Sequence, residues 1–359
     1  MSVPLFDTAT PLEPLEQELR AAIDRVLASR RYILGPEVRA FETEFADYVG
    51  ATHAIGVANG TDALTIALRA MDVGPGDEVV VPSFTFYASA EAIPPTGATP
   101  VFCDIDPETF CVTAQTVRAA LTPRTKAVIA VHLFGNVAPI AEIEALGVPV
   151  LEDAAQAAGS LGPHGRPGAL GTAATFSFYP SKNLGAFGDG GAITTSDATI
   201  AERVRALRFH GSRDKETFEE VGYNSRLDEI QAAVLRVQLP HLDEWADGRR
   251  AAASRYAASA LAGLVSLPEP TAGAEPAWHL YVIRSERANE LEAALRAQGI
   301  EARSYYRVPV HRQPAMAVDL DLPGTEEAAR TSLALPISPL LSAEQVQEVA
   351  SAVRSALSA

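Results

Sequence analysis

The chain has 359 residues, with 45 acidic and 29 basic side chains and a formal net charge of −16. Because phosphate backbones are bound mainly by Lys and Arg, this acidic excess argues against a dedicated nucleic-acid-binding protein. Hydrophobic residues make up 47% of the chain, as in a packed globular protein, but no apolar run approaches the ~18 residues that span a bilayer.

Two helical patterns come first, at Leu12–Ser29 and Pro36–Val49, and we expect them to pack on a smaller C-terminal domain or on a partner subunit. From about residue 52 to 195, short apolar runs alternate with helix-length segments such as Thr61–Met71 and Ala114–Leu121. Most of the runs are rich in Val, Ile and Phe and are bounded by Gly, Pro or Asp, as buried strands are. They lie at His53–Ala58, Glu78–Pro82, Pro100–Asp104, Ala127–His132, Val148–Leu151, Ala174–Phe178 and Gly191–Thr195. This alternation predicts an α/β fold with a mainly parallel seven-stranded sheet between helices.

The pattern changes after residue 225. Residues 226–262 resemble one long, Ala-rich amphipathic helix that Pro240 should kink or break. The elements that follow indicate a smaller α+β unit: a strand at His279–Arg284, a helix at Ala288–Ala297, a strand at Ile300–Tyr306 and a terminal helix from Ser342. We therefore expect a large domain over residues 1–240, including the N-terminal helices, and a small C-terminal domain over residues 241–359.

A single lysine, Lys182, lies in the Gly-rich segment SFYPSKNLGAFGDGG at residues 177–191, directly after a predicted strand. Phe176, Phe178 and Phe187 flank it. Aromatic surroundings desolvate an ammonium group and lower its pKa, so that the amine can attack a carbonyl. The glycines allow close approach of the backbone to a flat or phosphorylated group. The alternative is a surface lysine in an ordinary loop.

Two acids, Glu152 and Asp153, end the apolar run of VPVLEDAAQ at residues 148–156. Open α/β sheets bind ligands at the carboxyl ends of their parallel strands. An acid at this place can be a metal ligand, a helix cap or the partner of a protonated ring nitrogen, and a plain helix cap would need no function.

A third signal is VANGTDALTIAL at residues 57–68, where a strand ends, Gly60 and Thr61 turn the chain and a helix begins. A helix start exposes free N–H groups and a partial positive charge, which suits a phosphate. The spacing is not that of a Walker motif, and a simple capped turn is the alternative.

Together these signals supply the separate contacts of one cofactor. Pyridoxal phosphate needs a lysine for its aldehyde, an acid for its pyridine nitrogen, and a helix start with hydroxyls for its phosphate. An aromatic face for its ring is available in PSFTFYAS, residues 82–89, which contains Phe84, Phe86 and Tyr87.

With these motifs in place, the chain resembles the DegT/StrS-type sugar-nucleotide aminotransferases, a branch of the fold-type-I pyridoxal phosphate enzymes. The resemblance runs over nearly the whole length. It is carried by YILGPEVRAFETEFADYVG, NGTDALTIAL, GPGDEVVVPSFTFYASA, GATPVFCDID, HLFGN, EDAAQAAG, FSFYPSKNLGAFGDGGAI, GYNSRLDEIQAA and YYRVPVHRQPA. The block around Lys182 and the block NSRLDEIQAA are specific to this branch.

The resemblance implies roles for residues around the cofactor ring. Lys182 would form the Schiff base and then act as the general acid and base that moves protons between cofactor and substrate carbons. Asp153 would pair with the pyridinium nitrogen and keep it protonated. Gln156 would hydrogen-bond the phenolic oxygen of the ring, and Phe86 would stack on its face.

The resemblance also implies a phosphate site at the start of the helix that follows Gly60. Thr61 and the amide of Asp62 would hold the phosphate, and Ser177 would add a hydroxyl. Asn224 would reach the phosphate of the neighbouring subunit's cofactor, which implies a homodimer with shared active sites.

Candidates on the substrate side follow from the same resemblance. The residues expected near the sugar are Tyr179, Tyr305, Tyr306 and His311. Arg213 and Arg226 are candidates for anionic groups on either substrate, with a solvated side chain or a structural ion pair as the alternative.

The implied activity is that of a pyridoxal phosphate-dependent aminotransferase that converts a nucleotide-linked keto-sugar to an amino-sugar. L-glutamate would give up its amino group and leave as 2-oxoglutarate, and the keto-sugar would then accept that group in a ping-pong scheme. The segments HRQPA and HGSRDK favour a 3-keto over a 4-keto sugar. Two alternatives stay open: an aminotransferase acting on a cyclitol or another non-nucleotide ring, and a non-catalytic regulatory protein that keeps the fold.

The first residues lack a basic stretch followed by an apolar core, so we expect no secretory signal. Two cysteines are too few for a disulfide scaffold or a structural zinc site, and no metal is expected. We therefore expect a cytoplasmic enzyme that binds small substrates and neither nucleic acid nor membrane.

Overall fold

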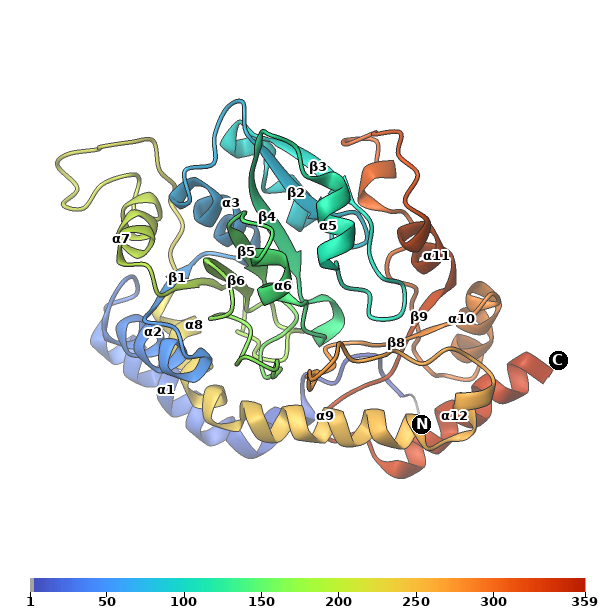
Figure 1. The fold of residues 1–359 in the computed structure, drawn as a ribbon. Coiled ribbons are helices and arrows are strands. Elements are labelled where there is room, and N and C mark those ends of the chain that lie inside the picture. The colour runs from blue at the N-terminus through green and yellow to red at the C-terminus, as the bar shows by residue number, and fades with distance from the viewer. Residues whose placement is uncertain (1–2, 359) are drawn as a thin grey trace.

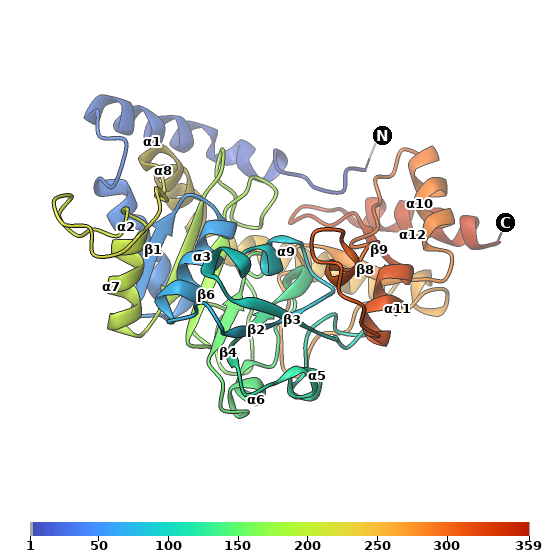
Figure 2. The same ribbon diagram turned by 90° about the horizontal axis from the view of Figure 1, so that it is seen from above.

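The larger part of the molecule is built on one seven-stranded sheet, in a computed structural model that describes residues 3–358 (Figures 1 and 2). The strands are β1 (His53–Val57), β2 (Glu78–Pro82), β3 (Thr99–Cys103), β4 (Thr125–Val131), β5 (Val150–Asp153), β6 (Ala173–Ser177) and β7 (Gly191–Thr195). Their order is β1-β7-β6-β5-β4-β2-β3, and β7 alone runs in the direction opposite to the other six strands. The predicted α/β fold with a mainly parallel seven-stranded sheet is confirmed.

The central strands show why these segments form a sheet. β2 is buried along its whole length, and in β4 only the first two residues are partly exposed. Strands covered on both faces are built from continuous runs of Val, Ile and Ala rather than from alternating polar residues. Because the parallel strands end at the same edge of the sheet, the residues that follow β2, β5 and β6 are brought together there.

Helices surround this sheet. In the sheet part they are α1 (Glu16–Ser29), α2 (Pro36–Val49), α3 (Gly60–Ala70), α4 (Ala88–Glu91), α5 (Ala114–Ala120), α6 (Ile140–Glu144), α7 (Ala198–Leu207) and α8 (Glu229–Gln238). α3 packs on β6 and β7, whereas α1 and α2 both pack on α8. The two helices therefore pack mainly on the sheet part and not on the small domain as expected. Leu19 and Val26 of α1 pack against Val234 and Ala233 of α8, and the apolar face of α2 lies in a cluster with Ala232 and Leu235 of α8. The alternative expectation, packing on a partner subunit, stays a prediction.

The helix predicted over residues 226–262 is two helices. α8 ends at Gln238, and α9 (Leu242–Ala257) begins after the short 3-10 turn η4 (Leu239–His241). Pro240 lies in this turn, where its ring and missing amide hydrogen interrupt the helical hydrogen bonds as predicted. In Figure 1, α9 runs along the lower side of the molecule from the sheet part toward the C-terminal part.

The C-terminal part contains a two-stranded antiparallel sheet of β8 (Tyr281–Arg284) and β9 (Ser332–Leu335), with α10 (Ala288–Ala297), α11 (Pro323–Thr331) and α12 (Ala343–Ser358). The predicted strand at Ile300–Tyr306 is wrong. Ile300 pairs only with Val3, and Arg303 pairs only with Ala334. Because these two residues pair with different segments, no continuous ladder forms.

Two further observations bear on the organisation of the chain. The apolar cluster of the C-terminal part includes Val3 from the start of the chain and Tyr256 from α9. Among residues 3–358, no helix is long and apolar enough to cross a membrane. The division into domains at residues 240 and 241 stays a prediction.

Candidate active site

Lys182 follows the carboxyl end of β6. A tight turn, in which the Lys182 amide donates to the Tyr179 carbonyl at 2.8 Å, carries the lysine back over the sheet edge. Burial lowers the pKa of its amine to about 8, although the nearby Asp153 carboxylate opposes the shift. A cavity of about 370 Å³ reaches Lys182, and Phe187 is among the residues that line it.

Asp153 is the last residue of β5, the strand beside β6. Its carboxylate is 5% exposed. Oδ2 accepts a hydrogen bond from Ser89 Oγ at 2.7 Å, and Oδ1 accepts one from the Ala155 amide at 3.2 Å. These two bonds fix the orientation of the carboxylate and leave further lone pairs for a ligand.

The neighbouring acid, Glu152, points to the other face of the sheet, as successive residues of a strand do. It is fully buried and lies 2.8 Å from His132 Nε2. Its two oxygens also accept hydrogen bonds from the amides of Gly168, Leu170 and Gly171 at 2.8–3.0 Å. Glu152 is thus an internal anchor for residues 168–171, and Asp153 is the acid of this pair that faces Lys182.

The start of α3 lies against the end of β6. A Cβ atom on Gly60 would come within 2.8 Å of Ser177 Cβ, so glycine permits the close approach of the two segments. The Asp62 amide, expected to hold a phosphate, already donates to the N-cap side chain of Asn59 at 2.8 Å. The N-cap takes one of the free N–H groups of the helix start, so a phosphate would compete with Asn59 for this amide, and the contact stays a prediction. Thr61 remains at the start of the helix beside Ser177.

Gln156 connects the sheet edge to the C-terminal part. Its Oε1 accepts from the Phe134 amide at 2.7 Å, and its Nε2 donates to the Tyr306 hydroxyl at 3.2 Å. The Phe86 ring lies 6.3 Å from the Tyr306 ring, and Phe86 is 58% exposed. Tyr305 is the neighbour of Tyr306, and their rings lie 5.5 Å apart.

His311 has a different environment from the one expected for a sugar contact. Its ring is fully buried, and Nδ1 lies 2.6 Å from Ser83 Oγ. Burial, together with the neighbouring Arg312, lowers the pKa of the imidazole. Ser83 follows β2, so this contact ties the loop after β2 to the C-terminal part and gives His311 a structural partner.

The remaining candidates are more exposed. Tyr179 is 55% exposed. Arg213 pairs with Glu202 at 3.4 Å and with Glu219 at 3.7 Å on the surface, which favours the structural alternative for it. Arg226 donates to the side chain of Asn224 and lies over the ring of Phe209.

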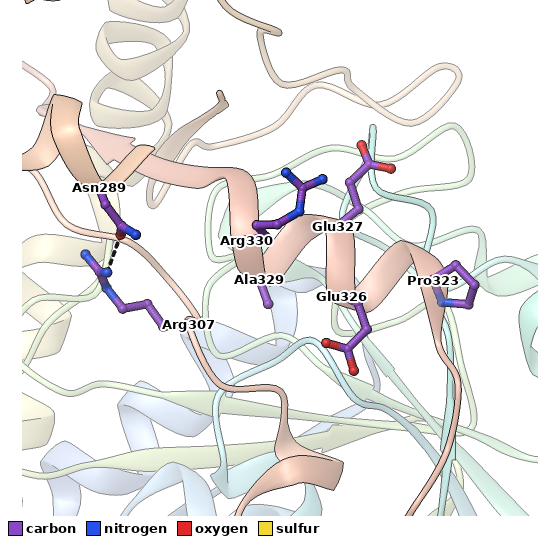
Figure 3. A pocket seen from close by; sticks show the side chains of 7 residues that line it. All are labelled: Asn289, Arg307, Pro323, Glu326, Glu327, Ala329 and Arg330. Atoms are coloured by element: carbon purple, nitrogen blue, oxygen red, sulfur yellow. Dashed lines mark hydrogen bonds between the residues drawn. The ribbon is translucent and has the colours of Figure 1, made fainter. Parts of the chain in front are cut away.

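A larger hollow of about 580 Å³ lies beside α11 in the C-terminal part (Figure 3). Its polar side chains already have partners, some of them outside the lining: Arg307 donates to Asn289 and to Glu292, and Glu326 accepts from Arg312 at 3.0 Å. Neither Lys182 nor Asp153 lines it. The volume of a hollow alone therefore does not show where the candidate catalytic residues of this protein lie.

Sequence reasoning missed Ser89 and Ser83. Both lie in the segment after β2, from which the sequence pattern indicated only the aromatic residues as candidates. The signal available in the sequence was a set of small hydroxyl residues directly after a predicted strand, at the sheet edge where ligands bind.

The residues at this edge fit pyridoxal phosphate. A buried amine with a lowered pKa suits an aldehyde, a buried and oriented carboxylate suits a protonated ring nitrogen, and a helix start beside a serine hydroxyl suits a phosphate. Lys182, Asp153, Ser177 and Thr61 are the side chains that could hold it. Their individual roles stay predictions.

The amino-acid sequence is similar to those of known proteins over nearly its whole length. Residues 14–354 match the model of the DegT/DnrJ/EryC1/StrS aminotransferase family. The chain is 48% identical over 362 residues to the dTDP-3-amino-3,4,6-trideoxy-alpha-D-glucose transaminase of Streptomyces venezuelae, covering 98% of this chain and 95% of the relative. It is 46% identical over 360 residues to the pleiotropic regulatory protein of Geobacillus stearothermophilus, covering 97% of each chain.

Among solved structures, that of S. venezuelae DesV in complex with a ketimine intermediate superposes with a TM-score of 0.96 at 47% identity, covering 100% of this chain and 99% of the other. The match therefore includes both the seven-stranded sheet and the C-terminal part.

Proposed function

The chain belongs to the DegT/DnrJ/EryC1/StrS aminotransferase family, and from this membership we propose that it transfers the amino group of L-glutamate to a nucleotide-linked 3-keto sugar. It is a sugar aminotransferase, and its cofactor is pyridoxal phosphate. The observation that carries the proposal is the half-buried Lys182, whose amine has a pKa lowered by desolvation, near the buried Asp153 carboxylate at the carboxyl edge of the sheet. The name of the S. venezuelae relative supports a sugar that is aminated at position 3.

Bound pyridoxal phosphate supplies an electron sink for the electron pair that remains when a proton leaves a substrate carbon. In our proposal Lys182 Nζ would hold the aldehyde carbon covalently until the amino group of the substrate displaces it, and the freed neutral amine would then take and return that proton. Asp153 would bind the ring nitrogen and Gln156 the phenolic oxygen. Ser177 and Thr61 would bind the phosphate.

The proposal is tested first with one substrate. The purified protein, loaded with pyridoxal phosphate, is given L-glutamate without any sugar. We expect a shift of the visible absorption band and release of about one 2-oxoglutarate per site, because a ping-pong enzyme completes this half-reaction alone. If glutamate leaves the spectrum unchanged, the proposed donor is wrong.

The acceptor is tested on the protein aminated in this way. dTDP- and UDP-linked 3-keto sugars, their 4-keto isomers and a cyclitol ketone are supplied in parallel, and the products are separated by chromatography. We expect the 3-keto nucleotide sugars to react fastest. A clear preference for the cyclitol ketone would establish the non-nucleotide alternative instead.

We also propose a homodimer with shared sites. Tyr32, Ile33 and Phe187 are 44–49% exposed, and their backbones bond to Glu229, Asp228 and Gln231 at the start of α8. Contiguous exposed apolar side chains of this kind mark association surfaces.

Mixed dimers test the sharing of sites. In a mixture of Lys182→Ala and Asn224→Ala chains, each mixed dimer has one site with both residues intact, so about a quarter of wild-type activity is expected to return. No recovery in a mixture that sedimentation shows to be dimeric would exclude shared sites.

One relative is named as a regulatory protein, so a non-catalytic role is the second candidate. The presence of Lys182, whose amine has a lowered pKa, near the buried and oriented Asp153 carboxylate supports catalysis, because perturbed groups of this kind cluster at functional sites. The glutamate half-reaction distinguishes the two.

A further inference from the structure

A pair of buried hydroxyls lies behind Asp153. Thr85 and Ser89 belong to the segment that follows β2, and they are 2% and 1% exposed. Ser89 Oγ lies 2.7 Å from Asp153 Oδ2, and Thr85 Oγ1 lies 3.0 Å from Ser89 Oγ. The three side chains therefore form one hydrogen-bonded row that ends on the carboxylate.

The direction of the bonds in this row follows from counting protons. An ionised carboxylate can only accept, and a serine hydroxyl has a single proton to give. Ser89 must therefore donate to Asp153, which leaves Thr85 as the donor in the contact between the two hydroxyls. Bonds to a charged acceptor are about twice as strong as neutral ones, and successive bonds in a row polarise one another.

We propose that Thr85 and Ser89 are positioning residues that hold the Asp153 carboxylate ionised and aimed at the ring nitrogen of pyridoxal phosphate. The proposal rests on the proposed role of Asp153. It gives a function to two residues that the sequence pattern left unassigned, and it places them on the segment that also carries Phe86, the expected stacking residue.

Loss of the Ser89 hydroxyl has a defined consequence. The donor stabilises the negative charge of the carboxylate, so without it Asp153 becomes a stronger base. A proton shared between the ring nitrogen and Asp153 then moves toward Asp153. Bulk water has no direct route to replace the donor, because both hydroxyls and the carboxylate are buried. The ring nitrogen loses positive charge, and the ring becomes a poorer electron sink.

The test compares the wild-type protein with Ser89→Ala, both loaded with pyridoxal phosphate labelled with ¹⁵N in the ring. The ¹⁵N chemical shift of the ring is measured without any substrate. We expect the wild-type protein to give the value of a protonated nitrogen and the variant to move toward the unprotonated value. Because no amino donor or sugar is used, the result does not depend on which substrates the enzyme accepts.

A kinetic measurement supplements the spectrum. In the glutamate half-reaction, we expect kcat of Ser89→Ala to fall about tenfold, the effect of losing one bond to a charged group, while KM changes less than twofold. Ser89→Thr keeps a hydroxyl and should restore both the shift and kcat. Thr194→Val is the control, because Thr194 makes an equally short buried bond, 2.7 Å to the Gly168 carbonyl, and should leave the ring shift unchanged.

Thr85→Val keeps Ser89 in place and should move the ring shift in the same direction by a smaller amount. If Ser89→Ala does not fold, the ring shift of Thr85→Val tests the proposal instead. A wild-type ¹⁵N value in the variants that fold and bind cofactor would overturn the proposal. An unprotonated nitrogen in the wild-type protein would overturn the role of Asp153 as well, whereas failure with glutamate alone affects only the proposed donor.

Discussion

The carboxyl edge of the seven-stranded sheet and the hollow beside α11 both gather charged side chains. At the sheet edge, Lys182 is half-buried and the pKa of its amine is lowered, and Asp153 keeps lone pairs free beyond its bonds to Ser89 and Ala155. In the hollow, each of the cations Arg307 and Arg330 is partly exposed and already bound to a carboxylate. Desolvated groups that still have free hydrogen-bonding positions can bind or react with a ligand. Charges that are already paired and solvated interact only weakly with one.

Among the variants that compare the sheet edge with the hollow, Lys182→Ala is expected to have the largest effect on activity. We expect kcat to fall at least about a thousandfold, because the variant loses the covalent attachment and the proton carrier together. Borohydride treatment followed by peptide mapping should label Lys182 in the wild-type protein and nothing in the variant. A label on another lysine would contradict the assignment.

Asp153→Ala is expected to lower kcat about a hundredfold and to weaken cofactor binding, because it removes the charge opposite the ring nitrogen. The measurements are the half-reaction rate and equilibrium dialysis of the cofactor. Glu152→Gln is the matched variant from the adjacent position, and it should reduce thermal stability through its lost bonds to His132 and residues 168–171 rather than weaken cofactor binding.

The pH dependence of cofactor attachment tests the burial of Lys182. In the apoprotein only the neutral amine attacks the aldehyde, and its pKa is lowered to about 8. The attachment rate should therefore rise about tenfold per pH unit below pH 8 and level off above it. Stopped-flow absorbance gives the rate, with a free lysine derivative as the control. A rate that continues to rise toward pH 10 would show that the amine is solvated.

Tyr306→Phe is expected to have a smaller effect. It removes the hydroxyl that accepts from Gln156 Nε2, a loss of about 1 kcal/mol that corresponds to about a fivefold lower kcat/KM. Tyr256→Phe removes a buried hydroxyl that donates to the Pro336 carbonyl in the C-terminal part, and it should lower thermal stability with kcat/KM unchanged. Equal kinetic effects of the two variants would argue against a role for Tyr306 at the site.

The smallest effect is expected in the hollow. Arg330→Ala removes a surface pair with Glu286 and should change the free energy of unfolding by less than about 1 kcal/mol, with activity unchanged. Denaturant unfolding and a steady-state assay measure the two quantities. A large loss of activity would mean that this hollow takes part in function and would remove the contrast between the two regions.

The strands of the sheet could be predicted from the sequence because each strand is defined by a local pattern of residues. Glu78–Pro82 and Gly191–Thr195 form strands with the predicted bounds, and Pro240 interrupts the helix as expected. These outcomes depend on burial and backbone chemistry within a few residues of the chain.

Features that depend on distant residues could not be predicted in the same way. The segment Ile300–Tyr306 has the composition of a strand, but its pairing partners lie at opposite ends of the chain. Ser83, which contacts the His311 ring, lies 228 residues away in the chain, so no local pattern could indicate this contact.

The first residues of the described chain connect three places that are remote in sequence. Val3 pairs with Ile300, the Leu5 amide donates to Glu301 at 2.9 Å, and Phe6 and Asp7 then line the cavity that reaches Lys182. A force applied to this segment would therefore act both on the Ile300–Glu301 segment of the C-terminal part and on the wall of the cavity, so a tag attached at this end is expected to disturb the cavity.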